Sequence, residues 1–177
     1  MTELHRLEIT IATEKQFFNS MDPAPFRQRE LDPAVVDYII AWAEKAPGGD
    51  DLGLMLRVEA PPADVDMQAI VVEAVGENFR RLAADQRRAL NRLFHDGRIS
   101  LIIGIAFVGL AITISDWVSA AFSTSHYAQI VGDSFMIGAW VALWHPTNIF
   151  LYDWWPLRRQ ALLYDRLSRM DVKVATP

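Results

Sequence analysis

The amino-acid sequence predicts a membrane α+β fold, which consists of a two-helix transmembrane hairpin, a small cytoplasmic α/β domain and a long helix running continuously into the first transmembrane span. Residues 99–122 and 128–152 are both apolar over more than the roughly 20 residues that a helix needs to cross a bilayer. Only five residues separate these two stretches. The rest of the sequence alternates between strand-like and helix-like patterns, which predicts a folded domain on one side of the membrane.

The distribution of charge orients this hairpin. No Lys or Arg lies within residues 99–157, whereas six arginines lie within residues 80–98 and four within residues 158–169. Because basic flanks stay on the cytoplasmic side, we expect a two-pass protein of the cell inner membrane with both termini cytoplasmic. Attraction to anionic lipid headgroups explains these arginines. The acidic N-terminal part, which has a net charge of −7 over residues 1–66, argues against nucleic acid as a partner.

Length and composition narrow the class of protein further. The chain has 177 residues, about one domain by length, and a formal net charge of −5. It contains no Cys, which excludes disulfides, thiolate metal sites and cysteine nucleophiles. The N-terminal residues carry no apolar leader, so the first span is expected to act as its own insertion signal.

The cytoplasmic α/β domain is expected over residues 1–63, in the order strand, loop, helix, strand. Alternating apolar residues predict strands at 6–12 and 52–59. A helix over 33–46 is predicted to begin after Asp32, because Asp at the N-cap followed by Pro is typical of a helix start. A right-handed crossover through this helix would make the two strands parallel.

A long juxtamembrane helix is predicted over residues 64–98, beginning near Asp64 or Asp66 and continuing into the first span. Its apolar residues are spaced alternately by three and four, which is the pattern of a coiled-coil seam with one polar member. The same pattern also fits an amphipathic helix packed on the sheet of its own domain. The predicted oligomer seam consists of Val72, Val75, Phe79, Leu82, Gln86, Ala89 and Leu93.

The C-terminal segment, residues 153–177, is expected to be cytoplasmic. Trp154 and Trp155 fit the aromatic belt at the inner interface, and residues 157–170 predict a short amphipathic helix. Val172 and Val174 predict a last strand that returns to the N-terminal sheet, with a free tail as the alternative.

Small residues follow one side of each predicted span, where they let helices approach closely within one hairpin or between subunits. A single hairpin has few neighbours for the polar groups in its spans, which favours self-association or a larger complex. The small residues are Gly104, Ala111, Ser115 and Ser119 in the first span, and Gly132, Gly138, Ala139 and Ala142 in the second.

Two acidic residues, Asp116 and Asp133, lie near the outer ends of the spans. They predict an acidic ring at the mouth of an oligomeric pore, or simply carboxylates among headgroups and water. The second polar group is His145, Thr147 and Asn148, around a proline that interrupts the second span. This group predicts a pore lining, a subunit interface or a cofactor-binding histidine, with a hydrogen-bonded histidine between packed helices as the alternative.

The loop over residues 13–32 is the most distinctive segment of the soluble part. Arg27 and Arg29 predict an anion or partner site beside a helix N-terminus, or a loop held by its own salt bridges. No P-loop or dinucleotide-binding glycine pattern is present. The sequence therefore assigns no catalytic residue, no metal site and no cofactor.

Three functions are compatible with these features. The first is a self-associating inner-membrane protein, either an ion channel or a membrane scaffold, with a cytoplasmic regulatory or assembly domain. The second is an accessory subunit of a larger respiratory or photosynthetic membrane complex. The third, an enzyme or cofactor-binding membrane protein that uses His145, is the least favoured, because no second ligand or base lies near this residue in the sequence.

Overall fold

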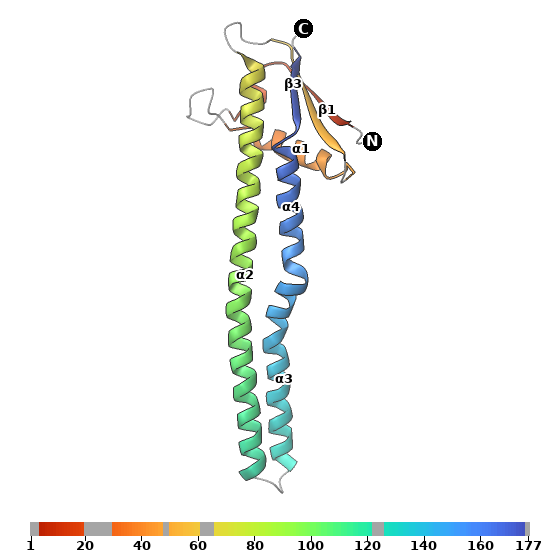
Figure 1. The fold of residues 1–177 in the computed structure, drawn as a ribbon. Helices are drawn as coiled ribbons and strands as arrows, with labels where there is room; N and C mark the ends of the chain where they lie inside the picture. The colour runs from red at the N-terminus through yellow and green to blue at the C-terminus, as the bar shows by residue number, and fades with distance from the viewer. Residues whose placement is uncertain (1–3, 20–29, 48–49, 61–65, 122–125, 176–177) are drawn as a thin grey trace. The chain divides into compact units, whose positions relative to one another are not determined.

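A computed structural model describes residues 4–19, 30–47, 50–60, 66–121 and 126–175 (Figure 1). The chain divides into two compact units. We call Met1–Gln86 with Arg159–Pro177 the head unit, and Arg87–Arg158 the helical unit. The elements follow the order β1 (Leu4–Ile11), η1 (Glu14–Gln16), α1 (Pro33–Ala43), β2 (Asp51–Val58), α2 (Met67–Ala121), α3 (His126–Asn148), η3 (Ile149–Asp153), α4 (Trp154–Leu167) and β3 (Asp171–Ala175).

The head unit contains a three-stranded parallel sheet in the order β1-β2-β3. The two N-terminal strands are parallel, as predicted. The predicted returning strand is also confirmed, because β3 pairs with β2 along Gly53–Arg57. A free C-terminal tail is therefore wrong for residues 171–175.

One face of this sheet forms the core of the head unit. Leu7, Leu54 and Val172 are register partners across the three strands, and all three are buried. The opposite face is polar, with an ion pair between Arg57 and Glu8 at 3.4 Å. Parallel sheets are usually covered on both faces, so a sheet with one charged face is unusual.

Helix α1 begins where the sequence predicts. The Asp32 carboxylate accepts a hydrogen bond from the Ala34 backbone N–H at 2.9 Å, and Pro33 takes the first helical position. The helix ends at Ala43, earlier than predicted, because the following residues form tighter i→i−3 turns: Ala46 N–H donates to the Ala43 carbonyl at 3.2 Å. Its buried residues Ile39 and Ala43 belong to the core of the head unit.

The connection from β2 to β3 contains all of α2, α3 and α4. Asp66 caps α2 by accepting from the Ala69 N–H at 3.1 Å, in agreement with one of the two predicted start sites. The first turns of α2 and the last turns of α4 contact each other in the head unit, where the rings of Phe79 and Tyr164 lie 6.4 Å apart. The head core is thus assembled from residues far apart in the sequence.

Helix α2 is continuous over 55 residues, as the sequence predicts for a helix that runs into the first span. Gly97 does not interrupt it. Among the described residues, one helix is long and apolar enough to cross a membrane, and it covers Met67–Val118. The region predicted as the second span is not one regular helix, since α3 ends at Asn148 and a π-helical segment, η3, follows.

Candidate functional site: the helical unit

Helices α2 and α3 pack against each other in an antiparallel arrangement. Successive residues toward the C-terminus of α2 contact residues successively closer to the N-terminus of α3. Several of these contacts involve the small residues that the sequence analysis named. Three of the small residues, Gly104, Ala111 and Ala139, are buried. The contacting pairs are Gly97 with Ile149, Gly104 with Leu143, Phe107 with Gly138, and Ser115 with Gly132.

Pro146 explains one close approach between these helices. Proline has no N–H, so the carbonyl of Ala142 loses the donor that it would have four residues later in a regular helix. On α2, the position that a Cβ would occupy at Gly104 lies 3.3 Å from this carbonyl oxygen. The Thr147 hydroxyl donates to the next carbonyl, that of Leu143, at 2.8 Å. The Thr147 hydroxyl therefore does not replace the donor that the Ala142 carbonyl lacks.

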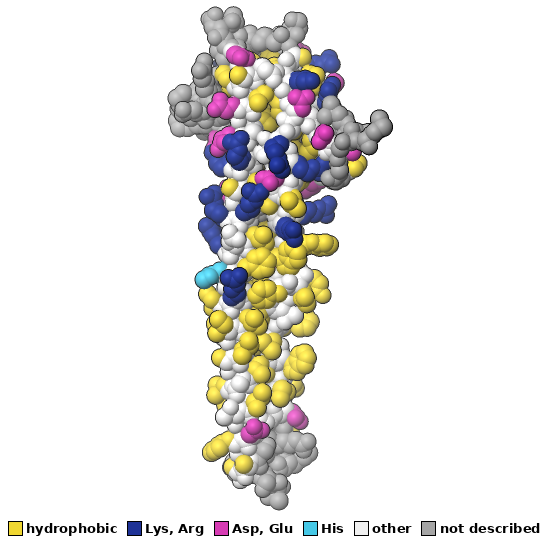
Figure 2. Space-filling model, in the orientation of Figure 1, with side chains coloured by type: hydrophobic (Ala, Val, Ile, Leu, Met, Phe, Trp, Pro, Cys, Tyr) yellow, Lys and Arg dark blue, Asp and Glu magenta, His cyan; other side chains and the backbone are white. Residues whose placement is uncertain are grey.

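Large apolar side chains cover the outward surface of both helices. Figure 2 shows hydrophobic side chains gathered over α2 and α3. A continuous exposed apolar surface of this kind is characteristic of a membrane-facing or partner-facing region. The exposed residues include Ile99, Ile102, Ile103, Ile105, Phe107, Leu110, Ile112 and Trp117 on α2, and Ile130, Met136, Ile137, Trp140, Val141 and Trp144 on α3.

One face of α3 carries two tryptophans at the centre of its apolar stretch. Trp140 and Trp144 are 74% and 67% exposed, and their indole N–H groups have no hydrogen-bond acceptor among the described residues. Together with Ile137 they follow the alternating three-and-four spacing of a helix-packing seam. Sequence reasoning overlooked this tryptophan face, although the spacing is visible in the sequence.

The two acidic residues and the histidine occupy different parts of the helical unit. Asp116 and Asp133 are both exposed and adjoin the contacting pair Ser115 and Gly132, so they belong to the same end of the helix pair. His145 is exposed and lies twelve residues from Asp133, about 18 Å along the helix. Asn148 is half-buried. The structure thus brings the acids to one level and keeps the polar group at 145–148 apart.

The predicted oligomer seam divides into buried and less buried members. Val75 and Phe79 lie in the core of the head unit, so the chain itself already covers them. Val72 is 43% exposed, whereas Leu82, Gln86, Ala89 and Leu93 are partly buried. The Gln86 side-chain oxygen is buried without a hydrogen-bond partner among the described residues.

A groove with a volume of about 500 Å³ lies on the described part of the head unit. Its lining includes Asp51 and Asp171, which are the first residues of β2 and β3, and Arg166 of α4. In parallel α/β sheets, ligands bind instead at the carboxyl ends of the strands. Arg166 is also already engaged, because its guanidinium donates to the Asp50 carbonyl at 2.8 Å. The groove therefore does not have the features of an active site.

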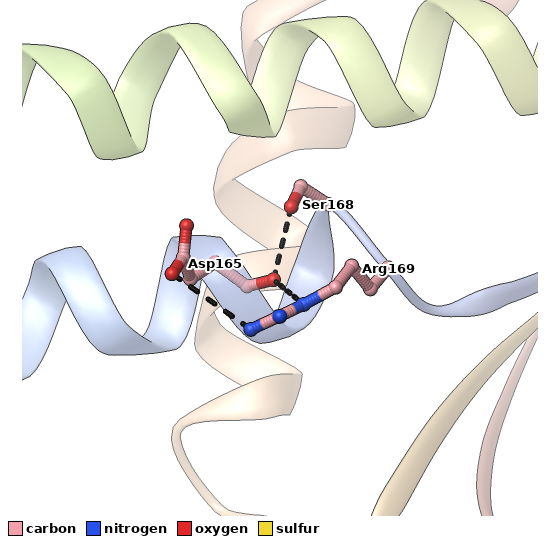
Figure 3. A network of polar contacts seen from close by, with 3 residues as sticks. All are labelled: Asp165, Ser168 and Arg169. Atoms are coloured by element: carbon pink, nitrogen blue, oxygen red, sulfur yellow. Dashed lines mark hydrogen bonds and ion pairs between the residues drawn. The ribbon is translucent and has the colours of Figure 1, made fainter.

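Figure 3 shows the polar contacts that close the end of α4 beside this groove. The backbone carbonyl of Asp165 accepts from the Ser168 hydroxyl at 2.9 Å and from the Arg169 Nε at 3.2 Å. The Asp165 carboxylate is also paired with Arg169 at 3.7 Å. These contacts satisfy the last turn of a helix, which is a structural role.

Tyr164 is the described group whose protonation the fold shifts most clearly. Burial raises the pKa of its phenol above the ordinary value of 10.0, and the nearby charges of Glu44 and Asp37 raise it further. Such a shift keeps the phenol neutral at physiological pH and provides no general base.

Other predicted sites receive no further support. Arg27 and Arg29 lie outside the described residues. Among the residues that the structure describes, no three His, Asp or Glu side chains come close enough to hold a metal ion. The chain matches no protein-family model, no curated protein and no solved structure.

Proposed function

We propose that this chain is a two-pass inner-membrane protein with both termini cytoplasmic, and that copies associate in the bilayer as a scaffold for their head units. The observation that carries the proposal is the exposed apolar surface of α2 and α3. In water, this much exposed apolar area would promote aggregation, whereas acyl chains would solvate it. The Lys- and Arg-free region of residues 99–157, flanked by arginines, supports the orientation.

The lengths of the helices agree with two spans. From Ile99 to Ala121, α2 rises about 35 Å, and the 23 residues of α3 rise about 35 Å as well. Both values exceed the roughly 30 Å of a bilayer core. Backbone groups inside the core must be satisfied within the protein, so the π-helical segment after Pro146 is acceptable only if it lies against protein, and its buried residue Ile149 contacts Gly97.

The tryptophan face of α3 supports self-association. Trp140 and Trp144 lie seven and nine residues from Asp133 and Asp153 respectively, about 10 and 13 Å inside the apolar stretch. Tryptophan prefers the membrane interface, and an indole N–H in the hydrocarbon core needs an acceptor. A neighbouring protein helix would remove both problems.

A second copy offers a surface of suitable size at the same depth. Because Phe107 contacts Gly138 and Gly104 contacts Ala142, Trp140 is level with Ala106 of α2. Ala106 and Gly109 are exposed, and the position of a Cβ on Gly109 has no atom within 4 Å. These small residues lie about 140–160° around α2 from Gly104, so they face away from α3 of their own chain. If two copies have the same orientation in the bilayer, Trp140 of one copy can therefore pack against Ala106 and Gly109 of the other.

Single-cysteine labelling tests the topology, and the natural absence of Cys gives a clean background. Cysteine is introduced by Thr10→Cys in β1 and by Ser125→Cys in the segment between α2 and α3. In intact cells a membrane-impermeant maleimide should label only the second variant. Labelling of Thr10→Cys in intact cells, or release of the protein by alkaline carbonate, would contradict the proposed two-pass topology.

Disulfide cross-linking tests the association. Membranes that contain both Ala106→Cys and Trp140→Cys copies should yield cross-linked heterodimers on oxidation. Pairing Trp140→Cys with Ile105→Cys is the matched control, because Ile105 is exposed at nearly the same depth and lies about 100° around α2 from Ala106. Native mass spectrometry of the wild-type protein should give a defined oligomer. A monomer rejects the scaffold, and stable foreign subunits would support an accessory role in a larger complex instead.

A channel is the second candidate, and the shared level of Asp116 and Asp133 favours it. In an oligomer these exposed carboxylates could form an acidic ring that concentrates cations. Asp116→Asn and Asp133→Asn should then lower cation conductance in planar bilayers, whereas the control Asp153→Asn, at the opposite end of the apolar stretch, should not. Absence of current from the reconstituted wild-type protein would leave the scaffold alone.

A further inference from the structure

We infer that three exposed arginines of the helical unit form a collar that selects anionic phospholipids in the cytoplasmic leaflet. This arginine collar consists of Arg92 and Arg98 of α2 and Arg158 of α4. The inference rests on the proposed membrane insertion and adds the chemical class of lipid that the protein retains. All three side chains are exposed.

The two α2 arginines occupy the depth of lipid headgroups. Arg98 directly precedes Ile99, the first exposed apolar residue of the predicted span. Arg92 lies six residues earlier, about 9 Å further from the apolar stretch. The headgroup region on each side of a bilayer is about 5–8 Å thick, and the long side chain of arginine can reach along the surface to it. Both guanidinium groups can therefore meet phosphates at the boundary.

The three arginines occupy separate positions on α2 and α4. Six residues place Arg98 about 120° around the helix from Arg92, and Arg158 is contributed by α4. Neither Arg92 nor Arg98 has an ion pair among the described residues. A single bound anion needs converging donors, whereas a ring of separated charges complements a layer of headgroups. Asp96 is exposed in the same stretch, and the net charge of residues 87–98 is still positive.

Arg158 belongs to an arrangement suited to the membrane interface. Its guanidinium carbon lies 5.7 Å from the centre of the Trp154 ring. The Trp154 indole N–H donates to the Phe150 carbonyl at 2.9 Å, which fixes the ring. A guanidinium held over an aromatic face keeps its N–H groups available for phosphate oxygens. Trp155, next in sequence, is exposed and suits the depth of the headgroups.

Lipid retention from mixed bilayers tests this inference on the full chain. The wild-type protein is reconstituted in vesicles with equal amounts of phosphatidylglycerol and phosphatidylcholine, extracted in mild detergent, and its bound lipids are counted by native mass spectrometry. Phosphatidylglycerol should exceed phosphatidylcholine. The triple variant Arg92→Gln, Arg98→Gln, Arg158→Gln should lose most of this preference, since one arginine near an anionic surface contributes about fivefold in affinity.

A charge-matched control separates the collar from net charge. Arg6→Gln, Arg57→Gln and Lys173→Gln remove the same number of positive charges from the exposed face of the sheet, and they should leave the lipid ratio unchanged. Equal loss in both triple variants, or no preference in the wild-type protein, would overturn the collar. Binding of an oligonucleotide by the wild-type but not the collar variant, without a change in lipid ratio, would also overturn it. Extraction by alkaline carbonate would instead reject the membrane insertion itself.

Discussion

The position that a Cβ would occupy on Gly104 lies 3.3 Å from the carbonyl oxygen of Ala142. In a regular helix this carbonyl would accept a hydrogen bond from the N–H of residue 146. Pro146 has no N–H and cannot donate it. The glycine thus allows the backbone of α2 to approach a carbonyl oxygen that lacks the N–H donor of a regular helix. A Cα–H of glycine facing this oxygen gives a weak but favourable contact. Gly104 and Pro146 would each weaken an isolated helix, and in this structure the two positions lie against each other.

Gly104→Ala is therefore expected to destabilise the helix pair. Its new Cβ would lie 2.9 Å from the Leu143 Cδ2 atom as well as 3.3 Å from the Ala142 oxygen, and the backbone oxygen cannot easily move. We expect a loss of about 1–3 kcal/mol, measured by thermal or detergent-induced unfolding followed by circular dichroism.

Gly109→Ala is the matched control for this change. No atom lies within 4 Å of its Cβ position, and alanine is the better helix former by about 1 kcal/mol. In a detergent that keeps the protein monomeric, so that the surface proposed for a second copy is not in use, Gly109→Ala should be neutral or stabilising. Equal effects of the two substitutions would show that the close approach at Gly104 does not matter for stability.

The sequence predicted most of the head unit because local signals were strong there. Asp32 and Pro33 mark the start of α1, and strict alternation marks β1 and β2. The returning strand β3 was predicted with a free tail as the alternative, because five residues carry little periodicity. Its pairing with β2 depends on the chain passing through three helices first, which no local pattern records.

The helical unit was predicted less completely, for a physical reason. Hydropathy identifies apolar helices but does not distinguish side chains that face lipid from those that face protein. The small residues such as Gly104 and Gly138 were found from their size, whereas the exposed face of Trp140 and Trp144 was overlooked. The heptad pattern around Phe79 was ambiguous for the same reason, because a core helix and a coiled-coil helix share a period near 3.5.

Gln68 is expected to protect the free edge of β3. Its side-chain amide donates to the Val172 carbonyl at 2.7 Å and accepts from the Val174 N–H at 2.7 Å, so it takes the place of a neighbouring strand. Gln68→Ala should cost about 1–3 kcal/mol for the two hydrogen bonds, and it should expose an edge that can pair with another chain.

Hydrogen exchange provides the measurement for Gln68→Ala. The Val174 amide should exchange faster in the variant, and the protein should aggregate more readily on storage. Gln160→Ala, at an exposed position of α4, is the control. Unchanged protection of Val174 in Gln68→Ala would exclude a role for the side chain in capping the edge.

Phe79 and Val72 distinguish a core role from an oligomer-seam role for the start of α2. Phe79 is fully buried in the head unit, so Phe79→Ala should destabilise it by about 3–5 kcal/mol at any protein concentration. Val72 is partly exposed, and Val72→Asp should leave the stability of the head nearly unchanged. If Val72→Asp instead dissociates an oligomer, as followed by native mass spectrometry, the predicted seam is used between chains.

Tyr164 should make the head unit lose stability at alkaline pH. Because the pKa of its phenol is raised above 10.0 in the folded state, the unfolded chain releases the proton first as the pH rises. The free energy of unfolding should therefore be unaffected by this group below pH 10.0 and decrease above it. Tyr164→Phe removes the titration, so the decline above this pH should become shallower.

Tyr38→Phe is the control, since Tyr38 is exposed. Urea unfolding across this pH range, with tyrosinate absorbance as the second readout, checks the prediction, and identical pH profiles for wild-type and Tyr164→Phe proteins would contradict it.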